Sequence, residues 1–316
     1  MSGNPGPVLV RGDPVSSWLT ACAIARFTGV DPSQVSVRVE ASHPSKSVFV
    51  RPEMDRLHRS LGLDVSTLRG AQSAQGWRAG PKLVSMSPFG ASLSGASFQN
   101  LWSRARSHGE RRSLSEFQSR KTTPGTFFVP ADAYGGALER IARRAGVGDG
   151  NAECVEPAMV IQTEPSDERS DLTANRRNIG TAVLPIQGLG DLRAMALDLS
   201  IRALIATWPR HRAQGLEQTE YERRLTCAAP VIADMRALVL GGGDRSPSLN
   251  HRISVWRELG RITPVDDDPF TAAEWIGALL QAGHQPEGYP KLVEAIPLDT
   301  LRQHIDAHAS CEVQHG

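Results

Sequence analysis

Residues 8–40 constrain the fold of this chain more than any other segment. A short β-branched run, VLV at 8–10, leads through a turn at 12–17 into an apolar, alanine-rich helical pattern. After Gly29, a second strand-like run, VSVRVE, ends at Glu40. A strand, turn, helix and second strand within about 30 residues form the opening unit of nucleotide-binding α/β folds. The sequence therefore predicts an α/β protein with a Rossmann-like domain at its start.

The turn of this unit lacks most of the glycines of a dinucleotide fingerprint. In G-x-G-x-x-G, the glycines allow a tight turn, close backbone approach to the pyrophosphate and close strand–helix packing. Here Gly12 is the only glycine of the six positions that end at Ser17; Asp13 adds a negative charge, and Pro14 has no N–H to donate. Glu40 lies 23 residues after Ser17, near the spacing of about 20 residues of a ribose-binding acid. Two interpretations stay open: a weakened cofactor site at Gly12, Ser17 and Glu40, or a plain turn capped by Asp13.

The rest of the chain divides into three predicted segments. Residues 1–147 hold the Rossmann-like domain with substrate-side insertions, and residues 148–178 form a polar connecting segment with one strand-like run, AMVIQT. Residues 179–316 hold a loop and then a mainly α-helical C-terminal region, in which Thr219 and Thr271 each open a capping box with a glutamate three residues later. The helices downstream carry apolar stripes that include Trp256 and Trp275, which we expect to be buried.

Composition excludes several classes of function. A net charge of +1 argues against a bulk electrostatic nucleic-acid binder, and no apolar run approaches the roughly 18 residues of a membrane span. The four cysteines are scattered without paired spacing, so we expect neither a zinc site nor a disulfide framework. A cytoplasmic location follows from this cysteine usage and from a start that lacks a secretory pattern. Only four lysines accompany 31 arginines, which limits the candidates for any lysine-dependent chemistry.

Several blocks, in one order along the chain, resemble flavin-dependent tryptophan halogenases. They are VLVRGDPVSSWLTACAIAR, RPEMDRLHRSLGLD, SPFG, PADAYGGALERIARRAGV, NIGTAVLPIQGLGDL, PSLNHRISVWRELGRI and WIGALLQAGHQPEGYPKLVEAIP. Together they cover about two-thirds of the chain, with the best matches after Asn178. The resemblance implies a reduced Rossmann-like domain of the FAD/NAD type followed by helices.

The resemblance also implies a chemistry. Members of this family bind reduced FAD supplied by a separate flavin reductase, and react it with oxygen and halide. Hypohalous acid then passes to an active-site lysine near the substrate, and a glutamate assists. In this chain the resemblance assigns Gly180 and Gly190 to the flavin side of the site, beside Gly12, Ser17 and Glu40.

The departures from the family affect the reacting groups. The family's lysine should fall between Ala71 and Trp77, where no lysine exists, and Lys82 is the nearest stand-in. The family's glutamate corresponds to Gln187, and an amide cannot act as a general base. The neighbouring serine and threonine of the family become Gly188 and Leu189. Lys82 and Gln187 are therefore the candidate catalytic residues, each in altered form.

Two functional hypotheses remain. In the first, the chain is a halogenase-like pseudoenzyme with weak or lost FAD binding that acts through a protein partner. In the second, it is an active FAD-dependent halogenase or monooxygenase acting on tryptophan or an indole-like substrate, with a separate reductase as partner. The first is favoured because the fingerprint glycines, the lysine and the glutamate are absent together. Neither hypothesis involves nucleic acid, a membrane or a metal ion.

Overall fold

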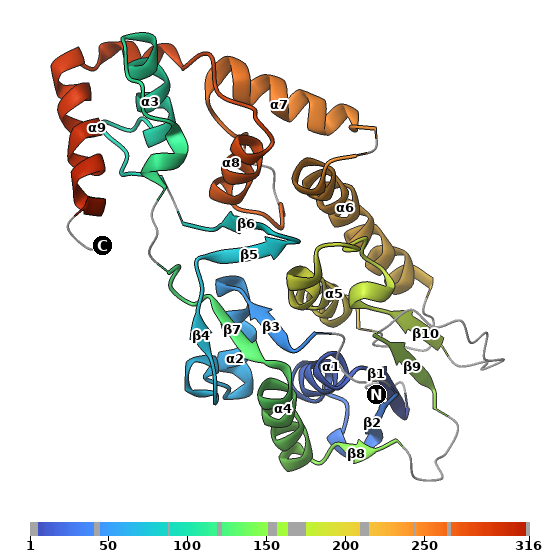
Figure 1. The fold of residues 1–316 in the computed structure, drawn as a ribbon. Coiled ribbons are helices and arrows are strands. Elements are labelled where there is room, and N and C mark those ends of the chain that lie inside the picture. The colour runs from blue at the N-terminus through green and yellow to red at the C-terminus, as the bar shows by residue number, and fades with distance from the viewer. Residues whose placement is uncertain are drawn as a thin grey trace. The chain divides into compact units, whose positions relative to one another are not determined.

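The structure is a computed structural model, and it describes residues 6–40, 45–87, 89–118, 122–150, 157–163, 175–208, 215–242, 244–263 and 267–313. The chain forms two compact units (Figure 1). The first unit comprises residues 1–74 and 124–232, and the second comprises 75–123 and 233–316. Each unit is therefore built from two stretches of the sequence. The predicted division at 148–178 stays a prediction, since much of that segment lies outside the described residues.

The first unit is organised by a five-stranded parallel sheet of order β10-β9-β1-β2-β8. Its strands are β1 (Val8–Gly12), β2 (Val35–Val39), β8 (Gly148–Asp149), β9 (Met159–Gln162) and β10 (Asn175–Asn178). All residues of β1 are buried, as expected for the central strand of a parallel sheet. The predicted strands at 8–10, at 35–40 and within AMVIQT are thereby confirmed.

Helices and a smaller sheet complete the first unit. Helix α1 packs against β1 and β2, and α4 and α5 pack against α1. The helices are α1 (Pro14–Phe27), α2 (Asp55–Leu61), α4 (Ala131–Ala145), α5 (Arg193–Ala206) and the part of α6 (Gly215–Leu240) up to Ile232. A three-stranded antiparallel sheet has the order β3-β7-β4, with β3 at Ser47–Val50, β7 at Phe127–Pro130 and β4 at Gln72–Ser73. The predicted α/β class with a Rossmann-like domain is confirmed.

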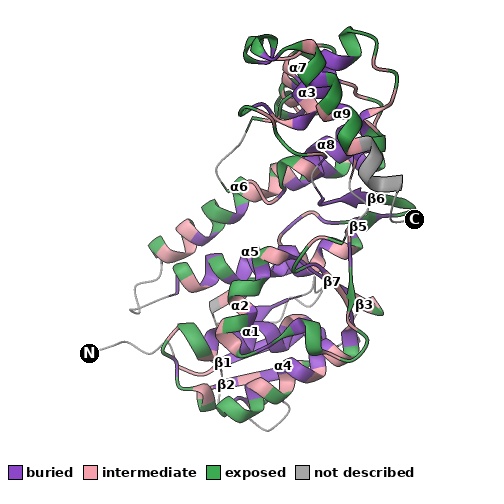
Figure 2. Ribbon diagram, turned by 90° about the vertical axis from the view of Figure 1, so that its left-hand side faces the viewer, coloured by how far each residue is buried: buried purple, intermediate pink, exposed green. Residues whose placement is uncertain are grey.

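The second unit is mainly helical. It contains the hairpin of β5 (Gly76–Ala79) and β6 (Lys82–Ser85), the end of α6, and α3 (Phe98–Ser107), α7 (Pro247–Leu259), α8 (Ala272–Gln281) and α9 (Leu298–Val313). Trp77, Trp102, Trp256 and Trp275 are fully buried in it. Figure 2 colours these helices by burial, with buried residues in purple beside exposed ones in green. The predicted mainly helical C-terminal region and its buried tryptophans are confirmed.

Helix α6 differs from the sequence prediction. The capping box at Thr219 predicts a helix start there and an interruption at Pro230, but α6 begins at Gly215 and continues through Pro230. Its apolar stripe runs on both sides of the proline, with Tyr221, Leu225 and Ile232 buried. Packing of this stripe outweighs the one backbone hydrogen bond that a proline removes. The second capping box is confirmed, because Thr271 and Glu274 bond reciprocally at the start of α8.

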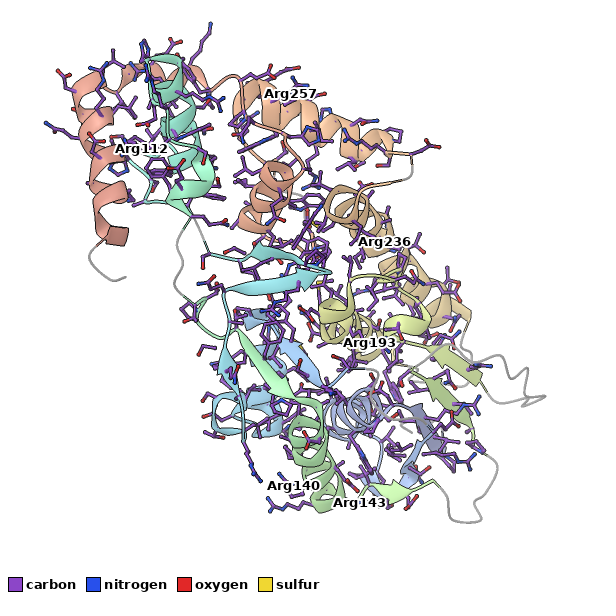
Figure 3. The ribbon with its side chains drawn as sticks, in the orientation of Figure 1. Arg112, Arg140, Arg143, Arg193, Arg236 and Arg257 are labelled. Atoms are coloured by element: carbon purple, nitrogen blue, oxygen red, sulfur yellow. The ribbon has the colours of Figure 1, made fainter. Side chains whose placement is uncertain are left out.

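Arginine side chains are spread over many elements. Figure 3 labels arginines on α4 and α5 in the first unit and on α6 and α7 in the second. Several are paired with nearby carboxylates: Arg143 lies 3.5 Å from Glu139, and Arg112 lies 2.7 Å from Asp306. Local pairing thus neutralises several of these arginines.

Candidate functional site

The β1–α1 turn is the first part of the candidate cofactor site. Asp13 is the N-cap of α1, with extended backbone and a side chain that accepts a hydrogen bond from the Ser16 backbone N–H at 3.1 Å. The Ser17 backbone N–H donates to the Asp13 carbonyl at 2.9 Å. Pro14 occupies the first helical position, where it has no N–H to offer. Asp13 is fully buried. Because it is the N-cap, its carboxylate lies at the helix N-terminus, where the helix dipole favours negative charge.

An arginine bridges the ends of three neighbouring strands. Arg11 Nε, at the end of β1, donates to the side-chain oxygen of Gln162 in β9. Its Nη1 lies 3.5 Å from a carboxylate oxygen of Glu40, just after β2. The Glu40 backbone N–H also donates to the Gly12 carbonyl at 3.0 Å. In open α/β sheets, ligands bind in a crevice at the carboxyl ends of the strands. In this chain, Arg11 contacts both Gln162 and Glu40 there.

The cavity described beside the N-terminus of α1 is small. A cavity of about 10 Å³ lies between α1, β3 and the start of α5, close to the minimum for a single water molecule. It is lined by Val15, Ser16, Ser47, Val48, Phe49, Gly190, Asp191, Arg193, Ala194 and Leu197. Ligand pockets usually measure about 300–1,000 Å³. Two of the segments that the sequence assigns to the flavin side, the turn at 12–17 and the loop at Gly190, therefore line one cavity together with β3.

The predicted loop residues have separate surroundings. Gly180 is buried with φ of 60°, a conformation that favours glycine, and its N–H donates to the Ser200 hydroxyl at 3.0 Å. Gly190 is exposed and has open space where a Cβ would stand. Gln187 is also exposed. Ser17, by contrast, is buried within α1, and its hydroxyl has no hydrogen-bond partner among the described residues. The cofactor roles of Gly12, Ser17, Glu40, Gly180 and Gly190 stay predictions.

Lys82 lies in the second unit, whereas Gln187 lies in the first. The Lys82 ammonium donates to the Val239 carbonyl at 2.6 Å, in the last turn of α6. A cation at this position pairs with the unsatisfied carbonyls and negative dipole end of the helix. Lys82 thus has a structural contact of its own, and its catalytic role, like that of Gln187, stays a prediction.

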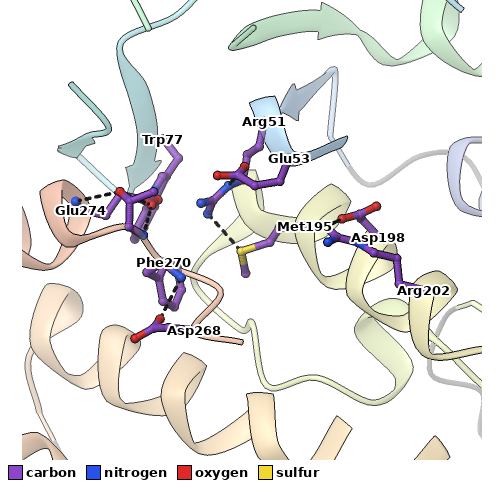
Figure 4. A network of polar contacts seen from close by, with 10 residues as sticks. Arg51, Glu53, Trp77, Met195, Asp198, Arg202, Asp268, Phe270 and Glu274 are labelled. Atoms are coloured by element: carbon purple, nitrogen blue, oxygen red, sulfur yellow. Dashed lines mark hydrogen bonds and ion pairs between the residues drawn. The ribbon is translucent and has the colours of Figure 1, made fainter. Parts of the chain in front are cut away.

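A buried charged cluster in the first unit was not predicted from the sequence. Arg51 follows β3, is buried, lies 3.1 Å from Glu53 and donates to the Met195 sulfur at 3.1 Å (Figure 4). Asp198 in α5 is also buried and pairs with Arg202. Burial raises the pKa of Asp198, and the Arg202 guanidinium offsets part of that rise. The sequence signal was a charged residue inside an apolar helical pattern, which requires a partner.

Two further polar residues meet in the core of the first unit. The His58 Nε2 lies 2.6 Å from the Tyr134 hydroxyl, and both side chains are buried. Burial lowers the pKa of His58 to about 4, so the imidazole is neutral at pH 7. Burial also raises the pKa of Tyr134. The pair is a neutral hydrogen-bonded contact between α2 and α4.

Two features are absent from the described residues. No three histidine, cysteine, aspartate or glutamate side chains among them gather in a way that would hold a metal ion. In the same part of the chain, no helix is both long and apolar enough to cross a membrane.

Comparison with known proteins identifies the fold. No family model matches the chain, and no curated protein matches its sequence. The structure is similar to BrvH, a flavin-dependent halogenase from Brevundimonas sp. BAL3, with a TM-score of 0.74 and 14% identity over 96% of this chain and 95% of that one. The fold is that of flavin-dependent halogenases. Xcc4156, a flavin-dependent halogenase from Xanthomonas campestris, gives a TM-score of 0.73 at 13% identity over 96% of this chain and 94% of that one.

The structure is also similar to that of a tryptophan 6-halogenase. SttH from Streptomyces toxytricini gives a TM-score of 0.69 at 10% identity, over 97% of this chain and 96% of that one. At these identities the likeness establishes the fold alone. The separate sequence blocks predicted a halogenase-like fold, and these solved structures confirm that prediction.

The residues at the N-terminus of α1 can be compared with what a flavin dinucleotide requires. A dinucleotide needs free N–H groups at the first helix, room beside them and an acid free to bind the ribose. Here the Asp13 carboxylate already takes the Ser16 N–H, the adjacent cavity holds about 10 Å³, and Glu40 lies against Arg11. These residues do not fit a flavin dinucleotide in the arrangement described.

Proposed function

We propose that this chain is a halogenase-fold pseudoenzyme that acts as a binding or partner protein and has weak or no affinity for FAD. The observation that carries the proposal is the small cavity beside the N-terminus of α1. Its cavity of about 10 Å³ is far below the roughly 300 Å³ at the lower end of ligand pockets. Without a flavin, neither oxygen nor halide can be activated in the way the halogenase resemblance implies.

The altered candidate catalytic residues support the same proposal. Gln187 keeps hydrogen-bonding atoms but cannot accept a proton from a reacting ring. Loss of a general base alone commonly lowers a rate by a factor of about 10²–10⁴. Lys82, the stand-in for the lysine, is engaged with the Val239 carbonyl. A cytoplasmic location and a protein partner belong to this proposal, whereas a flavin reductase belongs to the alternative.

The alternative is an active FAD-dependent halogenase or monooxygenase acting on tryptophan or an indole-like substrate. The observation that favours it is the halogenase fold, which extends over 96% of the chain. In that case the space beside α1 would have to open by movement of Phe49 or of the loop at Gly190. A separate reductase would then supply reduced flavin.

A halogenation assay separates the two. The protein is incubated with a flavin reductase, NADH, FAD, oxygen and bromide or chloride, with free tryptophan, indole and a tryptophan-containing peptide as substrates. We expect no halogenated product by mass spectrometry, while BrvH run in parallel as a flavin-dependent halogenase confirms the assay. Product that disappears in Lys82→Ala would overturn the proposal and give Lys82 the relay role. Product that persists in Lys82→Ala would indicate free hypohalous acid, hence a working flavin site, and would equally overturn it.

A further inference from the structure

The negative charge at the start of α1 is buried inside the protein. Asp13 has no exposed surface, and its carboxylate accepts the Ser16 N–H at 3.1 Å. The N-terminus of a long helix after a central parallel strand is where dinucleotide folds place a diphosphate. In this chain a side-chain carboxylate stands there, fixed by the backbone of its own turn.

A positive group lies on the preceding residue. Arg11 is buried, and its guanidinium contacts Gln162 from β9 and lies 3.5 Å from the Glu40 carboxylate after β2. The Thr163 N–H donates to the Arg11 carbonyl at 3.1 Å, which ties β9 to β1 at the same edge. The acid that would bind a ribose is therefore paired with a protein cation. The Arg11 guanidinium thus contacts side chains from both strands that flank β1.

We propose that Asp13 is an exclusion residue, whose carboxylate takes the place of a ligand diphosphate and keeps phosphate-bearing ligands out of the crevice. This inference deepens the proposed loss of flavin and rests on it. The Arg11–Glu40 pair closes the adjacent ribose position. The Rossmann-like unit is then complete without a cofactor, because its helix N-terminus already has an anion.

Electrostatics sets the size of the effect. A unit charge about 5 Å from a phosphate charge, at an effective dielectric constant of about 20, changes affinity by a factor of roughly 200–300. Removing the side chain also frees the Ser16 N–H and adds room. Glycine is also a favoured N-cap residue, so the fold should survive the change.

The test measures binding of inorganic pyrophosphate and of ADP by isothermal titration calorimetry. The variants are Asp13→Gly, which removes charge and bulk, and Asp13→Asn, which removes the charge and keeps a capping side chain. Asp31→Gly is the matched control, because Asp31 also caps a helix in the first unit, accepting the Ser33 N–H at 3.0 Å, and is exposed. Far-UV circular dichroism verifies the fold of each variant.

We expect no measurable pyrophosphate binding to the wild type or to Asp31→Gly. Asp13→Gly should bind pyrophosphate at least about tenfold more tightly than either, with Asp13→Asn between them. Equal binding by Asp13→Gly and Asp31→Gly would overturn the proposal, and so would tight binding of pyrophosphate or ADP by the wild type. Halogenated product from the wild type would instead refute the proposed function, so the two failures are distinguishable.

Discussion

Truncation of Trp256 tests the packing of the second unit. Trp256 lies in α7 with no exposed surface, and its indole N–H donates to the His284 carbonyl at 2.8 Å. A buried tryptophan removes about 150–250 Å² from water, which at about 25 cal/mol per Å² corresponds to roughly 4–6 kcal/mol as an upper limit. Truncation of a packed aromatic residue usually costs about 3–5 kcal/mol. Because the His284 carbonyl also loses its partner, we expect Trp256→Ala to lower the free energy of unfolding by about 4–5 kcal/mol.

Urea denaturation followed by circular dichroism at 222 nm measures this change. Trp256→Phe is the matched control, since it keeps most of the apolar area and loses the N–H donor. It should lower the free energy of unfolding by about 1–2 kcal/mol. If Trp256→Ala left the denaturation midpoint unchanged, Trp256 would be exposed in solution and the packing described for α7 would be wrong.

Three other predictions concern stability. Because burial lowers the pKa of His58 from an ordinary 6.5 to about 4, the unfolded chain binds a proton that the folded chain does not between these values. Stability should therefore fall as pH drops from about 6.5 to 4, by about 3 kcal/mol in total, and urea midpoints of His58→Gln should lack this part of the decline. Lys82→Met should lower the free energy of unfolding by about 1 kcal/mol, because the ammonium contact with the Val239 carbonyl at the end of α6 is lost. Lys82→Arg should be nearer the wild type. Equal urea midpoints for all three proteins would refute the structural role of Lys82. Gly90→Ala would place a Cβ 2.3 Å from the Phe98 ring and should cost about 1–3 kcal/mol, whereas Gly190→Ala, with open space around it, should leave the melting temperature nearly unchanged.

Local patterns explain what the sequence could predict of the fold. The run from Val8 to Glu40 shows a strand, a capped turn and a helix by residue type and spacing alone. The helices containing Trp256 and Trp275 show apolar residues at helical intervals and cap signals at their starts. These features depend on neighbours within a few residues, so one sequence is enough to read them.

The contents of the crevice depend on residues far apart in the chain. Arg11, Glu40 and Gln162 meet because β2 and β9 flank β1, and no local pattern fixes that strand order. The arginine within VLVRG did carry a signal, since a charge in a buried parallel strand needs a partner, but the partner could not be named. Asp13 could be recognised as a cap or as an obstacle to phosphate, and the structure shows that its carboxylate caps α1.

The likeness in sequence and the likeness in fold bear on different questions. The separate blocks predicted the halogenase fold, and solved halogenases confirm it at 10–14% identity. The roles of Gln187 and Lys82 depend on reacting groups that a fold does not determine. Chemistry therefore has to be measured on this chain.

Flavin binding tests the central claim most directly. The wild-type protein is dialysed to equilibrium against oxidised FAD and, under anaerobic conditions, against reduced FAD, and bound flavin is quantified by absorbance after denaturation. The small cavity at α1, the Asp13 cap and the Arg11–Glu40 pair predict far less than one flavin per chain at micromolar FAD in either redox state. One tightly bound flavin per chain, at sub-micromolar FAD, would contradict the account and favour an active flavin enzyme.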